Sequence, residues 1–187
     1  MKRLLCLLFI CATSLVSAQI TDIAVNKASF EKSDFPYKGD RVLLVDRING
    51  SKEENIFVFA KNKREEEQDI LYIQQFTKEN DKWELKVNKI IADEGIVTSV
   101  YNNRKAFNDV EKDGLVDALF IYTRNNKGDM DNPIEIIELL FHKHQLYWVS
   151  STSSSDFTED KYSSNFSTLP KAVQDYVLDY WKKLDKK

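Results

Sequence analysis

Residues 113–122 have the sequence Asp-Gly-Leu-Val-Asp-Ala-Leu-Phe-Ile-Tyr, in which an acidic turn leads directly into an apolar segment. A second stretch is similar, because Asn49-Gly50 is soon followed by residues 55–59, Asn-Ile-Phe-Val-Phe. Turn residues beside runs of β-branched and aromatic side chains are typical of strands. Both stretches therefore predict a buried strand that is entered from a glycine-containing turn.

The same pattern recurs along the chain and predicts eight strands. They are Arg41–Ile48, Asn55–Lys61, Ile70–Thr77, Trp83–Ile91, Gly95–Tyr101, Ala118–Arg124, Ile134–Phe141 and Leu146–Ser151. Asn49-Gly50-Ser51, Glu79-Asn80-Asp81 and Lys143-His144-Gln145 are typical of hairpin turns. Parallel pairing needs crossover helices, and no helical periodicity separates the segments. We therefore expect a mainly β (α+β) fold built from antiparallel meanders.

The spacing of the segments suggests an internal repeat. Gly50 and Trp83 are 33 residues apart, and Gly114 and Trp148 are 34 residues apart. Two related four-stranded units, offset by about 64 residues, produce this spacing. Chance similarity between apolar strands produces it as well, and the sequence leaves both explanations open.

The C-terminal residues 168–184 predict one amphipathic helix, with Thr168 as its cap and Pro170 in its first turn. Its apolar side chains recur every three or four residues: Leu169, Val173, Tyr176, Val177, Tyr180, Trp181 and Leu184. We expect this helix to cover one face of the sheet. Binding of the apolar stripe to a partner is the alternative.

The first eighteen residues are typical of an export signal. Lys2 and Arg3 precede the apolar run Leu4–Ile10, and Val16-Ser17-Ala18 fits a cleavage site. The apolar run is too short to span a bilayer, and no second candidate follows. We therefore expect residues 1–18 to be a signal peptide, residues 19–187 to be a single β-rich domain, and no transmembrane segment to remain after cleavage.

Cleavage would remove Cys6 and Cys11, the only cysteines, so the mature chain would have no disulfide. This absence favours a bacterial envelope or secreted protein. Without Lys2 and Arg3 the chain has 25 basic and 30 acidic residues, a net charge of −5. This charge argues against nucleic acid or anionic lipid as a partner and is compatible with divalent cations.

The acidic turn has the spacing of a calcium loop. Asp109, Glu111, Asp113 and Asp117 occupy positions 1, 3, 5 and 9, with Gly114 at position 6. The carbonyl oxygen of Leu115 would supply the ligand at position 7. Position 12 has no glutamate, which excludes an EF-hand. The loop looks more like the strand-preceding calcium loops of integrin-type propeller repeats. An Asp-Gly turn whose carboxylates bind backbone amides is the alternative.

Other chemistry-bearing groups have simpler explanations. We expect His142 and His144 to be surface residues at a hairpin turn and not the start of a zinc site. Asp129 and Asp131 complete a cation site only if folding brings them close to Asp109. We interpret residues 65–67, three glutamates, as a solvated loop.

The sequence has no nucleophile elbow and no glycine-rich phosphate loop, so it contains no motif that indicates catalysis. Seven aromatic side chains can stack on sugars if they are exposed, and they fit strand and core positions equally well. They are Tyr37, Tyr72, Trp83, Tyr101, Tyr122, Tyr147 and Trp148.

Two stretches carry a family resemblance: residues 107–122, with Asp113-Gly114 and Asp117 before an apolar strand, and residues 156–173, with Phe166 and Leu169-Pro170 before the final helix. The chain resembles small exported bacterial proteins labelled as surface polysaccharide biosynthesis proteins. That resemblance implies export and a β-rich fold, and it supplies no catalytic residues.

Together these features indicate an exported, non-catalytic β-rich module of the bacterial envelope. It would be associated with surface polysaccharide and would bind an envelope protein or a glycan, with calcium as its one candidate cofactor. Its expected location is periplasmic, outer-surface or secreted. An envelope enzyme or enzyme accessory that acts on surface polysaccharide is the alternative.

Overall fold

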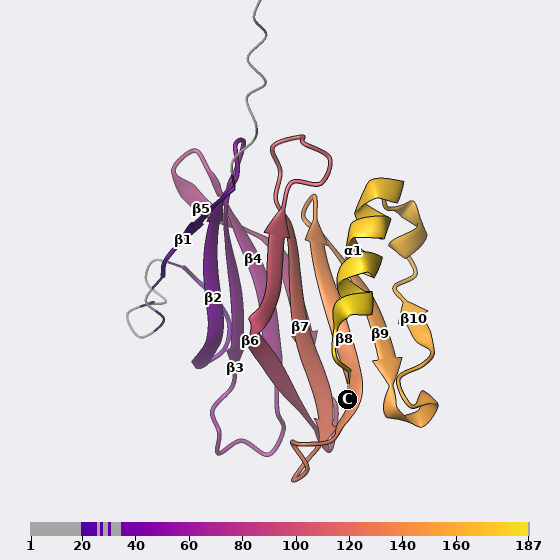
Figure 1. Cartoon of the computed structure of the whole chain (residues 1–187). Helices are drawn as coiled ribbons and strands as arrows, with labels where there is room; N and C mark the ends of the chain where they lie inside the picture. The colour runs from indigo at the N-terminus through magenta and orange to yellow at the C-terminus, as the bar shows by residue number, and fades with distance from the viewer. Residues whose placement is uncertain (1–19, 26, 28–29, 31–34, 187) are drawn as a thin grey trace, which may run out of the picture.

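The computed structural model describes residues 20–25, 27, 30 and 35–186. They form two antiparallel five-stranded sheets and one C-terminal α-helix (Figure 1). The first sheet contains β1 Thr21–Ile23, β2 Arg41–Asn49, β3 Glu54–Lys61, β4 Leu71–Glu79 and β5 Lys82–Ile91. The second contains β6 Ile96–Asn108, β7 Asp117–Asn126, β8 Pro133–His142, β9 Gln145–Thr152 and β10 Asp160–Tyr162. The expected mainly β fold with antiparallel meanders is confirmed.

Every strand pairs with its neighbour in the sequence, in the orders β1-β2-β3-β4-β5 and β10-β9-β8-β7-β6. The chain passes between the sheets through residues 92–95. Each sheet thus contains a four-stranded meander plus one short edge strand, β1 or β10. Two of the predicted hairpin turns have positive φ at both central residues, as type I′ turns require: Asn80 with Asp81, and Lys143 with His144.

The inner faces of the two sheets pack against each other around aromatic rings. Phe57 and Phe59 on β3 face Phe120 on β7, with ring centroids 5.3 and 4.9 Å apart, and Phe141 on β8 joins them. All four side chains are fully buried. Each contributes about 2–3 kcal/mol of apolar burial, so this cluster holds the sheets together.

The outer faces are covered as well, which explains why β3 and β7 are continuous apolar runs. On the second sheet, Leu119 and Ile121 pack under the helix α1 Lys171–Lys183, which turns Val173, Val177 and Trp181 inward. On the first sheet, Ile56 and Val58 lie under Phe35 and Tyr37 of the N-terminal segment. The prediction that the helix covers a sheet face is confirmed.

The helix begins later than predicted, and Thr168 does not cap it. Pro170 is the N-cap residue, and Thr168 belongs to the short 3-10 helix η3 Phe166–Thr168, where its hydroxyl donates to the Asn165 carbonyl at 2.7 Å. The pyrrolidine ring of Pro170 disfavours helical backbone at the preceding residue, and Leu169 is indeed extended. A second 3-10 helix, η2 Ser153–Ser155, follows β9.

The strand predicted for residues 95–101 is too short, because β6 continues to Asn108. Its pairing with β7 is interrupted between Val100 and Lys105, and the ladder resumes beyond the bulge. The intervening residues are polar, so their sequence did not indicate a strand. The predicted signal peptide, residues 1–18, lies outside the described residues. Among the described residues, no helix combines the length and apolar character needed to cross a membrane.

Candidate functional site

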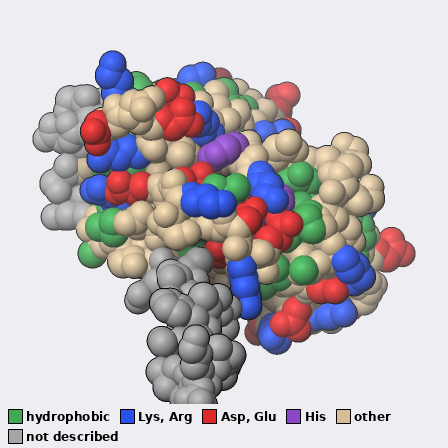
Figure 2. All heavy atoms as spheres, turned by 90° about the horizontal axis from the view of Figure 1, so that it is seen from above, with side chains coloured by type: hydrophobic (Ala, Val, Ile, Leu, Met, Phe, Trp, Pro, Cys, Tyr) green, Lys and Arg blue, Asp and Glu red, His purple; other side chains and the backbone are tan. Residues whose placement is uncertain are grey.

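The acidic loop between β6 and β7 lies at one end of the sandwich, together with the β2–β3, β4–β5 and β8–β9 turns. Figure 2 views the molecule from this end and shows histidine side chains among acidic and basic ones. The loop contacts the turn after β2, since the Lys52 amide donates to the Gly114 carbonyl at 3.1 Å. A Cβ on Gly114 would lie 2.5 Å from the Ser51 hydroxyl. The two glycine turns marked by the sequence repeat therefore pack against each other.

The loop carboxylates bind the backbone of the loop itself. Asp109 accepts hydrogen bonds from the Asp113 amide at 2.9 Å and the Gly114 amide at 2.8 Å. Asp113 accepts from the Leu115 amide at 3.0 Å, and Asp117 accepts from the Val110 amide at 3.0 Å. These contacts fix the bend without any ion.

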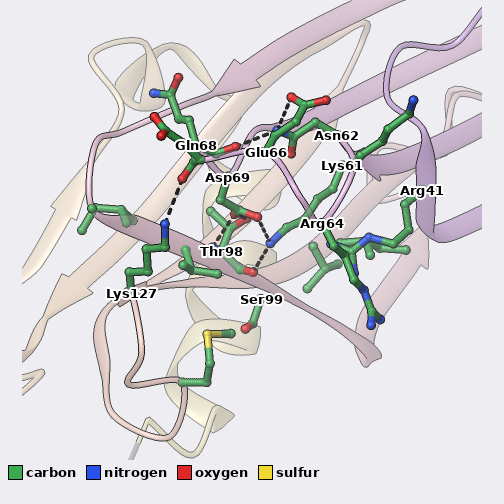
Figure 3. Close-up of a pocket in the computed structure, with 18 of the residues that line it drawn as sticks. Arg41, Lys61, Asn62, Arg64, Glu66, Gln68, Asp69, Thr98, Ser99 and Lys127 are labelled. Carbon is green, nitrogen blue, oxygen red and sulfur yellow. Dashed lines mark hydrogen bonds and ion pairs between the residues drawn. The ribbon is translucent and has the colours of Figure 1, made fainter.

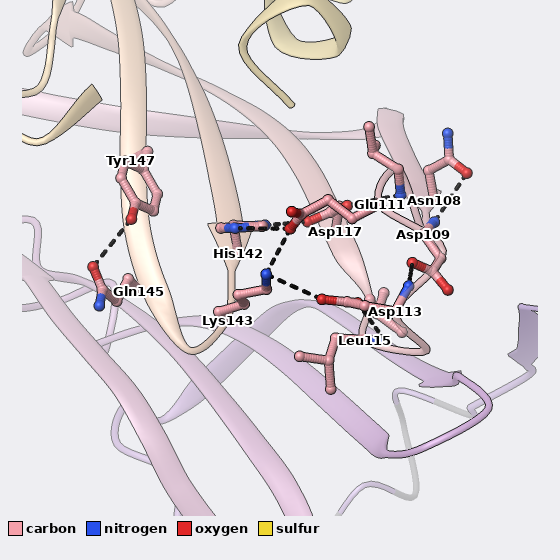
Figure 4. A network of polar contacts seen from close by, with 12 residues as sticks. Asn108, Asp109, Glu111, Asp113, Leu115, Asp117, His142, Lys143, Gln145 and Tyr147 are labelled. Atoms are coloured by element: carbon pink, nitrogen blue, oxygen red, sulfur yellow. Dashed lines mark hydrogen bonds and ion pairs between the residues drawn. The ribbon is translucent and has the colours of Figure 1, made fainter. Parts of the chain in front are cut away.

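The ammonium group of Lys143 lies between two of the predicted calcium ligands (Figure 4). It is 2.6 Å from Glu111 Oε2 and 3.1 Å from Asp113 Oδ2. Burial opposes ionisation of Asp113, but the Leu115 amide and Lys143 outweigh it and hold the pKa of this carboxyl below its ordinary value. The chain thus supplies its own cation to the loop. In the described ranges, no three His, Cys, Asp or Glu side chains are grouped to hold a metal ion.

The prediction that both histidines are surface residues is wrong for His142, which is only 5% exposed. Its Nδ1 lies 2.6 Å from Asp117 Oδ1, and its Nε2 lies 3.6 Å from Glu111 Oε2. The turn consists of Lys143 and His144, so His142 is the last residue of β8 and faces the acidic loop. Asp117 and His142 thereby tie the start of β7 to the end of β8.

His144 connects this end to the first sheet. Its Nε2 lies 3.4 Å from Glu53, and its Nδ1 lies 3.5 Å from Gln75 on β4. The fully buried Asn55 continues the network, accepting hydrogen bonds from Gln75 at 2.9 Å and Thr77 at 2.7 Å. Asp129 and Asp131, in contrast, lie beyond the far end of β7 and do not approach Asp109. The acidic end is therefore a polar joint between the sheets.

The opposite end contains a cavity of about 630 Å³ that the sequence analysis did not predict. It lies where β2 and the β3–β4 loop of one sheet meet β6 and the β7–β8 loop of the other (Figure 3). Six basic side chains line it against three acidic ones: Lys27, Arg41, Lys61, Lys63, Arg64 and Lys127, against Glu66, Glu67 and Asp69. The wall is thus cationic on a chain whose net charge is negative.

A buried ion pair supports one wall of this cavity. The Lys61 ammonium lies 2.7 Å from Asp69 Oδ1 and donates to the Thr98 carbonyl at 2.6 Å. Asp69 also accepts from the amide and hydroxyl of Thr98, both at 2.9 Å. Burial lowers the pKa of Lys61, Asp69 partly offsets this, and the nearby Arg41 lowers it further. The pair fixes β3 to β6 across the two sheets.

Lys27 and Lys127 donate to the carbonyls of Leu43 and Glu67, whereas three other cations are available for a ligand. Among the described residues, no hydrogen bond or ion pair engages the guanidinium groups of Arg41 and Arg64, and Arg41 Nε is buried without a partner. Lys63 is exposed and equally unengaged within that part of the chain. Guanidinium groups without an internal partner can donate charge-assisted hydrogen bonds to an anionic acceptor. The run Lys61-Asn62-Lys63-Arg64 was the available sequence signal, but the cavity also needs residues from four other segments.

The aromatic side chains that were considered for sugar stacking lie mostly in the core. Tyr37, Tyr122 and Tyr147 are buried, and Trp83 packs against Phe35 at 5.1 Å between centroids. Trp148 is partly exposed on the inner face of β9. They do not form an exposed stacking platform in the described structure.

Comparison of the chain with protein-family models, curated proteins and solved structures finds no match.

Proposed function

We propose that this chain is a non-catalytic, β-rich binding module of the bacterial envelope that holds an acidic surface glycan in the cationic cavity. One observation carries this proposal: Arg41 and Arg64 line a large cavity, and no described residue forms a hydrogen bond or an ion pair with either guanidinium group. Planar guanidinium groups suit carboxylate, sulfate or phosphate groups, because their paired N–H donors match two oxygens at once. The resemblance to exported polysaccharide-associated proteins agrees with a glycan ligand.

The negative net charge favours a ligand that reaches only the cavity. Nucleic acid presents a continuous array of phosphates and would meet repulsion across most of this surface. A flexible acidic glycan can instead place one or two anionic sugars beside Arg41 and Arg64. Binding should weaken with added salt, since ion pairs between the anionic sugars and these arginines would be partly exposed to solvent.

Isothermal titration with polygalacturonate and with its carboxyl-reduced form tests the proposal. The acidic polymer should bind and the neutral polymer should not. Arg41→Gln combined with Arg64→Gln should weaken binding at least about tenfold, because each charge-assisted contact is worth about 1.5–3 kcal/mol. Lys112→Gln, an exposed cation at the opposite end, should leave affinity unchanged.

Equal binding of both polymers, or equal losses in Lys112→Gln and the arginine double variant, would refute the cavity as the site. Analysis of the polymer after incubation separates binding from catalysis. Shortened chains would favour the alternative function, an envelope enzyme that acts on polysaccharide.

Calcium at the acidic loop stays a prediction, with a specific condition attached. Glu111 and Asp113 must release Lys143 before they can bind the ion. Millimolar calcium should raise the melting temperature by linkage, Asp113→Ala should abolish the increase, and Lys143→Met should enlarge it. A wild-type melting temperature that does not respond to calcium would contradict the prediction.

A further inference from the structure

A second cavity of about 410 Å³ lies between the end of β5 and the inner faces of β7, β8 and β9. We call it the apolar cleft. Eight of its twelve lining residues are apolar: Ile90, Ile91, Ala92, Tyr122, Ile137, Leu139, Leu146 and Trp148. Its volume falls within the range of small-molecule sites.

Apolar side chains continue from the buried lining of the cleft to its opening. Ile137 and Leu139 belong to the core between the sheets and are almost fully buried. Leu146 and Trp148 are partly exposed, and Ile90 is 45% exposed. These exposed aliphatic side chains are continuous with the core, and water makes no favourable contacts with them. An aliphatic chain laid along them would bury apolar surface that otherwise contacts water.

The polar groups of the cleft leave one donor for a head group. Arg124 is held by Asp93 at 2.8 Å and by Glu135 at 2.9 Å, and its Nε is buried out of reach of a ligand. Lys89 is exposed, and its ammonium has no hydrogen bond or ion pair to any described residue. An added carboxylate therefore meets the free ammonium of Lys89.

We propose that the apolar cleft binds a fatty carboxylate, with its acyl chain along Ile90, Leu146 and Trp148 and its carboxylate at Lys89. This site is separate from the cationic cavity and does not rest on the proposed glycan function. Hydrocarbon fits better than a peptide strand, because the β5 edge carries Lys82, Glu84, Lys86 and Lys89, charges that oppose strand addition.

Quenching of tryptophan fluorescence by brominated dodecanoate, below its micelle concentration, tests the site directly. Trp148 lines the cleft, whereas Trp181 and Trp83 lie in the other two packing clusters. Wild-type fluorescence should be quenched in a saturable manner, and Trp148→Phe should lose most of that quenching. Across octanoate, decanoate and dodecanoate, affinity should rise about fourfold for each added methylene until the cleft is filled.

Two variants on one strand form a matched pair. Ile90 and Leu85 are 45% and 44% exposed on β5, but only Ile90 lines the cleft. Ile90→Glu should weaken dodecanoate binding at least about tenfold by placing a charge beside the chain, and Leu85→Glu should not change it. Lys89→Gln should weaken binding of dodecanoate and leave dodecanol unaffected.

Three binding results would overturn the proposal. They are the absence of saturable quenching in the wild type, equal quenching in Trp148→Phe, and equal effects of Ile90→Glu and Leu85→Glu. Sedimentation provides the remaining check. The wild type could sediment as a dimer that Ile90→Glu dissociates, and bind no fatty acid. That result would assign the cleft to a second copy of the chain and refute the acyl site.

Discussion

Replacing Glu138 with glutamine should remove a pH dependence of stability that the wild-type chain carries. Glu138 lies on the outer face of β8 beneath α1, between Ile121 and Val149 in the ladder. It is fully buried, and neither carboxylate oxygen has a hydrogen-bond partner in the described structure. The corresponding position of the first sheet, 64 residues earlier, is Gln74, whose amide bonds to the Lys38 backbone.

Burial sets the size of the effect. It raises the pKa of Glu138 from 4.5 to about 9, and Lys186 offsets only part of the rise. Between these two values the folded chain keeps a proton that the unfolded chain has released, so stability must fall as pH increases. The slope is about 1.4 kcal/mol per pH unit, and by pH 7 the accumulated loss is about 3 kcal/mol.

Urea unfolding of the wild type and Glu138→Gln at pH 5.5, 6.5 and 7.5 measures this loss. Between pH 5.5 and 7.5 the free energy of unfolding of the variant should rise by about 2–3 kcal/mol relative to that of the wild type, because glutamine does not titrate. Glu94→Gln, at an exposed position in the crossover, should follow the wild type. A constant difference between Glu138→Gln and the wild type would show that Glu138 is ionised in the folded chain and would refute the reasoning.

Three further tests use urea unfolding. Lys105→Met leaves the buried Asp46 without its partner and should destabilise the chain by about 3–5 kcal/mol. Adding Asp46→Asn should restore stability, and a double variant that is as unstable as Lys105→Met would contradict this. Asn55→Ala removes the acceptor of two buried donors and should cost about 2–3 kcal/mol, so a neutral result would show that water replaces it. Gly114→Ala should cost more than Gly95→Ala, since both have positive φ but only Gly114 would clash, with Ser51; equal costs would exclude that contact.

The strands were predictable because their signals are local. Runs such as residues 55–61 and 118–124 are apolar on both faces, and turn residues limit them at each end. The helix start at Lys171 was missed because the Pro170 ring acts on the backbone of the preceding residue, which the side-chain pattern does not show. The short edge strands β1 and β10 were also missed. Their residues are largely exposed, so little apolar pattern marks them.

The candidate sites were harder to predict because they depend on contacts between distant segments. The spacing of the acidic loop was visible, but Lys143, which neutralises it, lies 30 residues after Asp113 in a different hairpin. His142 was placed at the surface because its exposure depends on which two residues form the turn. The cationic cavity combines β2, the β3–β4 loop, β6 and the β7–β8 loop, and no periodicity in the sequence connects them.

The order of the strands has a consequence for synthesis of the chain. Every ladder joins sequence neighbours, so the first sheet can pair completely once Ile91 has left the ribosome. Its inner face, with Phe57 and Phe59, stays uncovered until β7 and β8 follow, the latter ending about 50 residues later. At about 5–20 residues per second, this interval is roughly 2.5–10 s. Variants that weaken only the second sheet should therefore lengthen exposure of a preformed aromatic surface, and aggregate more than their loss of equilibrium stability alone predicts.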